Sequence, residues 1–110
     1  MRYAIPTANG ELCQHFGHCR EFAILDVEDG AVVRAQFHAP PAHEPGVLPQ
    51  WLSEQKVNIV IAGGMGSRAQ DFFRQYGIEV VVGAQTGEPR AVVESYLAGT
   101  LQSGVNICDH

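Results

Sequence analysis

Short runs of apolar residues alternate along the chain with segments in which apolar residues recur every three or four positions. The runs at residues 2–7, 57–64 and 78–84 are almost wholly apolar and predict strands that are covered on both faces. In residues 21–39, partially alternating apolar residues flank Asp29-Gly30, a pair typical of a two-residue hairpin turn. The pattern therefore predicts a first buried strand, a hairpin and two further buried strands.

Three segments have the spacing of amphipathic helices. The first holds Leu48, Trp51 and Leu52, with Pro49 in its first turn, and the second covers residues 66–77. The third covers residues 88–99. The order of the elements predicts a three-layer α/β fold with a mixed sheet of about five strands, mostly parallel, with the antiparallel hairpin at one edge.

Length and charge limit the class of protein. A chain of 110 residues forms one domain, here 1–110, and its last residues, 100–110, have little periodicity. The net charge is −5 and the seven basic residues are scattered, which argues against nucleic-acid binding. No apolar run reaches the roughly 20 residues of a membrane span, and the start does not resemble a signal peptide. We therefore expect a cytoplasmic protein.

The stretch CQHFGHC, residues 13–19, concentrates metal-binding side chains. Thiolate and imidazole groups suit iron, copper, zinc and iron–sulfur clusters, and Gly17 allows a bend that brings His15 and His18 together. The spacing is not that of a structural zinc finger. An alternative remains open, in which Phe16 packs in the core and the histidines face solvent. The candidate metal ligands are Cys13, His15, His18 and Cys19, with Cys108 and His110 of the tail in addition.

The tail allows three interpretations. Residues 100–110 could form a disordered end, a packed strand-like end, or an arm that folds over the metal site. The pairing of Cys108 with His110 repeats the ligand types of Cys13 and His15, and this favours the arm.

The segment GGMGSRA, residues 63–69, is a second candidate site. Glycines let backbone N–H groups approach a ligand, and a helix N-terminus favours negative charge. We expect Gly64 and Gly66 to be needed because a Cβ would block a close approach or forbid a positive φ. The segment is not a phosphate loop, and a tight strand-to-helix turn explains it equally well. The candidate cofactor-binding residues are Gly63, Gly64, Met65, Gly66 and Ser67, together with Phe16 and Gly17.

Topology predicts that the two candidate segments meet. Ligands of open α/β sheets gather beyond the carboxyl ends of the parallel strands. The first strand ends at Thr7, just before the cysteine–histidine turn, and another strand ends at the glycine-rich turn. An enzyme has less support, because there is no G-x-S-x-G motif and no third group that would orient a Cys13 or Cys19 nucleophile.

Three stretches resemble the dinitrogenase iron–molybdenum cofactor biosynthesis family, the NifX/NifB-type domain. They are HFGHCREFAILDVEDG, VNIVIAGGMGSRAQDFFRQYGIEVVVGA and YLAGTL. The resemblance implies a ribonuclease-H-like fold and the handling of iron–sulfur or molybdenum-containing clusters. In family terms, His15, Phe16 and Gly17 match the H-F-G element, and Gly63, Gly64 and Gly66 match the glycine-rich turn.

Residues and resemblance together predict a non-enzymatic carrier or scaffold for a metal or metal–sulfur cofactor. The cargo would contain iron, molybdenum, copper or zinc, and a delivery or acceptor protein would be the partner. Two alternatives remain open. One is a binding module for a small anionic metabolite or a regulatory protein, and the other is a thiol-dependent or metal-dependent enzyme.

Overall fold

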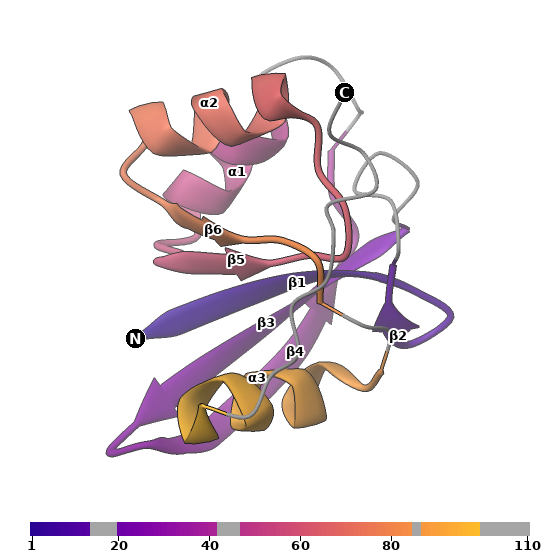
Figure 1. Cartoon of the computed structure of the whole chain (residues 1–110), viewed down its shortest axis with the longest axis vertical. Coiled ribbons are helices and arrows are strands. Elements are labelled where there is room, and N and C mark those ends of the chain that lie inside the picture. The colour runs from indigo at the N-terminus through magenta and orange to yellow at the C-terminus, as the bar shows by residue number, and fades with distance from the viewer. Residues whose placement is uncertain (14–19, 42–46, 85–86, 100–110) are drawn as a thin grey trace.

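The computed structural model describes residues 1–13, 20–41, 47–84 and 87–99 (Figure 1). The strands are β1 (Arg2–Ala8), β2 (Glu11–Leu12), β3 (Glu21–Glu28), β4 (Ala31–His38), β5 (Ile59–Ile61) and β6 (Glu79–Val81). The helices are α1 (Val47–Glu54), α2 (Ser67–Gln75) and α3 (Pro89–Ala98). None of these helices is long and apolar enough to cross a membrane.

The strands form one mixed sheet in the order β4-β3-β1-β5-β6. β1 pairs in parallel with β5, and β5 with β6, whereas β3 pairs antiparallel with both β1 and β4. This confirms the predicted mixed sheet with the hairpin at one edge. The sequence did not predict β2, a two-residue strand that pairs antiparallel with the end of β1.

Helices cover both faces of the sheet, which confirms the three-layer architecture. Figure 1 shows α1 and α2 on one face and α3 on the other. Successive residues of a strand point to opposite faces, so β1 contributes to both cores. Ala4 joins the apolar cluster beneath α1 and α2, and Tyr3 and Ile5 join the cluster beneath α3.

The hairpin shows why its apolar alternation is broken in the sequence. β3 is an interior strand and is buried on both faces. Phe22 and Ile24 lie in the α1/α2-side cluster, and Ala23 and Leu25 lie in the α3-side cluster. Leu25 therefore interrupts the sequence pattern because the strand has no solvent face. The predicted turn is confirmed, since both Asp29 and Gly30 have positive φ angles.

Candidate functional site

The carboxyl ends of three parallel strands form the edge of the sheet that carries the candidate site. Tyr3 and Ala4 of β1 pair with Ile59 and Val60 of β5. Ile61, the last residue of β5, pairs with Val81 of β6. Because these strands run in the same direction, the segments that follow them leave the sheet at one edge. The predicted edge is therefore present, whereas the meeting of the cysteine–histidine turn with the glycine-rich turn stays a prediction, because residues 14–19 lie outside the described residues.

The cysteine–histidine turn is anchored to the end of β1 at both of its ends. The backbone N–H of Cys13 donates to the carbonyl of Pro6 at 2.8 Å, and the N–H of Arg20 donates to the carbonyl of Thr7 at 2.8 Å. Thr7 is fully buried, and its Oγ1 donates to the carbonyl of Glu21 at 3.0 Å. Two consecutive residues of β1 thus fix where the turn begins and ends.

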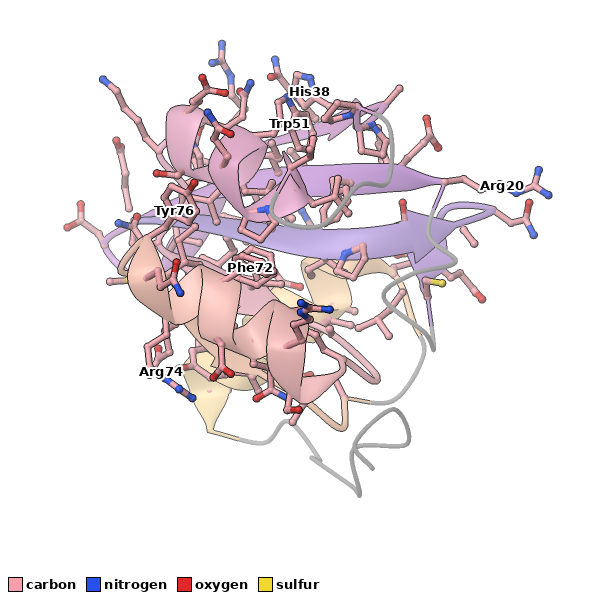
Figure 2. All side chains as sticks on the ribbon, turned by 90° about the horizontal axis from the view of Figure 1, so that it is seen from above. Arg20, His38, Trp51, Phe72, Arg74 and Tyr76 are labelled. Carbon is pink, nitrogen blue, oxygen red and sulfur yellow. The ribbon has the colours of Figure 1, made fainter. Side chains whose placement is uncertain are left out.

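Arg20 marks the outer end of this turn. Its side chain is exposed and extends away from the sheet (Figure 2). It places a positive charge at the same edge as the anchors of the turn.

Cys13 lies at the base of the turn, and its side chain is buried. Its side chain is only 8% exposed and belongs to the cluster that also contains Phe22, Met65 and Phe73. The side chain of Cys13 therefore packs among apolar residues. The assignment of Cys13 as a ligand stays a prediction.

The glycine-rich turn continues from β5 into α2 and is held by the segment that follows β6. The N–H of Gly83 donates to the carbonyl of Gly63 at 2.7 Å, and the N–H of Ala84 donates to the carbonyl of Ala62 at 3.2 Å. Gly63 and Gly64 are buried, whereas Gly66 is partly exposed and Ser67 is exposed. The backbone therefore rises from the core to the surface within this turn.

Met65 anchors the turn in the core. Its side chain is fully buried in the α1/α2-side cluster, and its carbonyl accepts a hydrogen bond of 2.9 Å from Nε2 of Gln70. A side chain buried in this way points away from the surface of the turn. Any contact between Met65 and a bound group at that surface would therefore use its backbone.

The start of α2 lacks a side-chain cap. Gly66 is the N-cap residue, it makes no side-chain hydrogen bond, and the first turn contains no acidic residue. The first hydrogen bond along the helix is donated by the N–H of Gln70 to the carbonyl of Gly66 at 3.1 Å. The amides of Ser67, Arg68 and Ala69 precede it and have no acceptor within the helix, which leaves a partial positive charge at this end. Backbone N–H groups at this position can bind an anion.

One expectation about the glycines is wrong. Gly66 has φ −65° and ψ 153°, an extended conformation open to any residue, so a positive φ is not the reason for a glycine there. Neither Gly63 nor Gly64 is among the described glycines with a positive φ. Beside the glycine-rich turn, Gly83 has a positive φ of +81°, and its N–H holds that turn. Sequence reasoning missed Gly83, although a glycine near the end of an apolar run was a signal.

Most of the predicted ligands lie outside the described residues. This applies to His15, Phe16, Gly17, His18, Cys19, Cys108 and His110. Within residues 1–13, 20–41, 47–84 and 87–99, no three His, Cys, Asp or Glu side chains gather as a metal site. The predicted metal site therefore stays a prediction, and so do the interpretations of the tail.

Among the described groups, a pKa shift is resolved for Tyr3, whose side chain lies in the α3-side cluster. Burial raises the pKa of Tyr3, and the charges of Tyr96 and Glu79 raise it further. The ring of Tyr3 packs edge-on against Tyr96 of α3, with 5.8 Å between the ring centroids. This pair stabilises the α3 layer and is not part of the candidate site.

Comparison with known proteins gives consistent matches over nearly the whole chain. The sequence model of one family, described as dinitrogenase iron-molybdenum cofactor, matches residues 1–99. An uncharacterized protein of Methanocaldococcus jannaschii, MJ0580, is 30% identical over 107 residues, which cover 93% of this chain and 90% of that protein.

Solved structures share the fold. The crystal structure of PH0822 superposes with a TM-score of 0.88 at 31% identity and covers 96% of each chain. The apo form of the orange protein from Desulfovibrio gigas superposes with a TM-score of 0.75 at 20% identity, over 96% of this chain and 93% of the other. At that identity, the second likeness shows the fold alone.

Proposed function

Because the chain belongs to the dinitrogenase iron-molybdenum cofactor family, we propose that it is a non-enzymatic carrier of a metal or metal–sulfur cofactor during cofactor assembly. The observation that supports this most directly is the anchoring of both ends of the cysteine–histidine turn at the carboxyl end of β1. The same edge of the sheet carries the uncapped start of α2. In our proposal, the soft ligands of the turn and the backbone donors of α2 act together at this edge.

The anchors limit where the ligands can lie. Residues 14–19 lie between Cys13 and Arg20, whose amides bind the adjacent carbonyls of Pro6 and Thr7. A closed segment of this length extends at most roughly 12 Å from its base. We therefore propose that His15, His18 and Cys19 act at this edge of the sheet. In our proposal these three side chains supply the metal–ligand bonds.

The glycine-rich turn would complement the charge of the cargo. Metal–sulfur clusters are commonly anionic, and the start of α2 offers amides, the helix dipole and the exposed Arg68. Gly64 and Gly66 would allow the cluster to approach the backbone, and Ser67 adds a hydroxyl at the first helical position. Met65 would contribute through its backbone, because its side chain packs in the core.

A carrier must also release what it binds. Sites with four cysteine thiolates retain a metal firmly, whereas a few histidine and cysteine ligands can be exchanged by an acceptor protein. We propose iron or molybdenum in a metal–sulfur cluster as the cargo, with copper and zinc as the other candidates. Cys108 and His110 would add ligands if the tail folds over the site. Transfer to or from a partner protein would take place in the cytoplasm, where thiols stay reduced.

The proposal is tested by metal binding under anaerobic conditions. Reconstitution with iron, sulfide and molybdate should load the wild-type chain, and the His15→Ala/His18→Ala double variant should load at least about tenfold more weakly, since two ligands are lost. His38→Ala is the matched control, because His38 lies on β4 and contacts Gln36 at 3.3 Å. A double variant that binds as tightly as the control would overturn the proposal.

A second candidate function has its own observation. The uncapped start of α2 alone could bind a small anionic metabolite. In that case the metal-free chain would bind molybdate or sulfate with equal affinity before and after the loss of His15 and His18. Our proposal expects the metal-free chain to bind these anions only weakly. It expects a metal–sulfur cluster to bind tightly, and only to a chain that has both histidines.

A further inference from the structure

β4 forms a long edge of the sheet. It has eight residues, Ala31–His38, and none of the described strands pairs with its outer side (Figure 1). From Arg34 to His38 its pairing with β3 is regular. A long edge strand presents a row of backbone donors and acceptors with which another strand can pair.

The α3-side face of β4 is apolar where it meets solvent. Phe37 is 50% exposed, and Phe37 and Ala35 lie opposite Ala23 and Leu25, two residues buried in the α3-side cluster. A groove of about 220 Å³ lies on this face, and its lining includes Ala35, Phe37 and Pro89. A strand added to β4 with apolar side chains on this face would therefore extend the α3-side core.

The direction of α3 sets where the last residues of the chain begin. α3 packs against β4 and β1, and it starts beside the end of β4, where Pro89 and Phe37 line one groove. It ends toward the start of β1, where Tyr96 packs on Tyr3. β4 and β1 run in the same direction, since both are antiparallel to β3. Residues 100–110 therefore follow α3 from the end of the sheet at which β4 begins.

We propose that residues 104–108, which lie outside the described residues, form a strand parallel to β4 on its outer side. In the register that we propose, Val105 would lie beside Ala35, and Ile107 would lie beside Phe37. Both apolar side chains would then cover the groove on the α3 side of the sheet.

The topology of the sheet favours this connection. α2 connects β5 to β6 on one face, and the chain there moves away from β4. α3 would connect β6 to the added strand on the other face, in the opposite direction across the sheet. Reversing both the face and the direction leaves the hand of a crossover unchanged. The new connection would therefore have the same hand as the one through α2, and parallel crossovers share one hand almost without exception.

Length and charge select the chain's own end over a second copy. Residues 100–103 would cross from the helix layer to the sheet, a step of roughly 10 Å, and four residues span up to about 13 Å. Residues 100–108 carry no charged side chain, whereas a second copy would bring a net charge of −5 against an equal charge. A short tether also gives a local concentration on the order of millimolar, which a separate copy lacks.

The pairing would carry the tail to the carboxyl edge of the sheet. Cys108 would lie beside His38, in the row of paired residues that contains Pro6, Phe22 and His38. The first member of this row anchors the cysteine–histidine turn. His110 would extend beyond the end of β4. The pairing itself does not depend on a metal, but a role for these two residues as ligands rests on the proposed function.

Amide hydrogen exchange of the metal-free chain tests the pairing. The amides of β4 that point away from β3 should exchange about tenfold or more slowly in the full chain than in a chain without residues 100–110. Ile107→Lys should speed their exchange by a similar factor, because an ammonium group would be desolvated at the groove. Asn106→Lys is the matched control and should exchange like the wild type, since Asn106 would lie beside the exposed Gln36 on the other face. The amides of β1 should stay protected in every variant and report that the fold is intact.

A disulfide tests the register. In a metal-free Cys19→Ser chain, His38→Cys should form a disulfide with Cys108 of the same copy, since neighbouring strands lie within disulfide range. Ala31→Cys, at the other end of β4 and roughly 23 Å away, should not.

Three results would each overturn the pairing. They are equal exchange of the β4 amides with and without residues 100–110, crosslinking at Ala31→Cys as readily as at His38→Cys, and crosslinking mainly between copies. Because both measurements use the metal-free chain, a failure of the pairing is distinct from a failure of the carrier proposal, which is tested by metal loading.

Discussion

Replacing Met65 separates a core anchor from a metal ligand. The side chain is fully buried in the cluster beneath α1 and α2, at the point where the glycine-rich turn enters α2. Met65→Ala removes three buried heavy atoms, worth about 2.4 kcal/mol at roughly 0.8 kcal/mol each. The cavity left behind adds to this, and the total should be about 3 kcal/mol. Met65→Leu keeps the volume and should cost less than about 1.5 kcal/mol.

Urea unfolding followed by circular dichroism measures these changes. With a slope of about 2 kcal/mol/M, the midpoint of Met65→Ala should fall by about 1.5 M. Val33→Ala is the control, because Val33 is 55% exposed and its loss should change stability by about 0.5 kcal/mol at most. The same variants are then tested for metal loading, where Met65→Leu should equal the wild type. A folded Met65→Leu variant that fails to load would mean that the thioether is a ligand, and an unchanged midpoint in Met65→Ala would refute the anchoring role.

Three further predictions concern the site and the fold. Gly66→Val should weaken cluster loading and leave the far-ultraviolet dichroism near wild type, since φ −65° suits valine. Gly83→Val, at φ +81°, should instead destabilise the fold by about 1–2 kcal/mol. Normal loading in folded Gly66→Val would argue against the role of the turn. Thr7→Val removes the hydrogen bond to the Glu21 carbonyl and should cost about 1 kcal/mol in urea unfolding, and an unchanged midpoint would show that this bond is unimportant. Because the pKa of Tyr3 is raised in the folded chain, its stabilisation is fully present below the ordinary pKa of 10.0 and is lost as pH rises through the higher folded pKa. Above pH 10.0 the wild type should therefore lose stability faster than Tyr3→Phe in urea unfolding. Parallel losses in the two chains would contradict the shift.

The fold could be predicted from the sequence because its main signals are local. Asp29-Gly30 marked the hairpin turn, and both residues have the positive φ that the turn needs. Gly77 and Gly99 marked the ends of α2 and α3, and both have positive φ angles. The edge at which we propose the site also followed from topology, because parallel strands end at the same edge.

What the sequence did not reveal depends on tertiary contacts. β2 is only two residues long and exists because Thr7 and Ala8 of β1 pair with it, so no periodic pattern could mark it. The burial of Met65 was hidden by its glycine neighbours, which indicated a turn but not which side chain of the turn is buried. The extended backbone of Gly66 and the role of Gly83 depend on how the segment after β6 pairs with the glycine-rich turn. The predicted ligands of residues 14–19 and of the tail lie outside the described residues.

The most direct test of the carrier proposal is the metal content of the chain purified without oxygen. Elemental analysis and an absorption spectrum are recorded on the wild type and on the His15→Ala/His18→Ala variant. We expect iron or molybdenum in the wild type, together with the visible absorption of a metal–sulfur chromophore, and a loss of both in the variant. A wild-type chain that is colourless and metal-free, and that stays so after incubation with iron, sulfide and molybdate, would contradict the proposal.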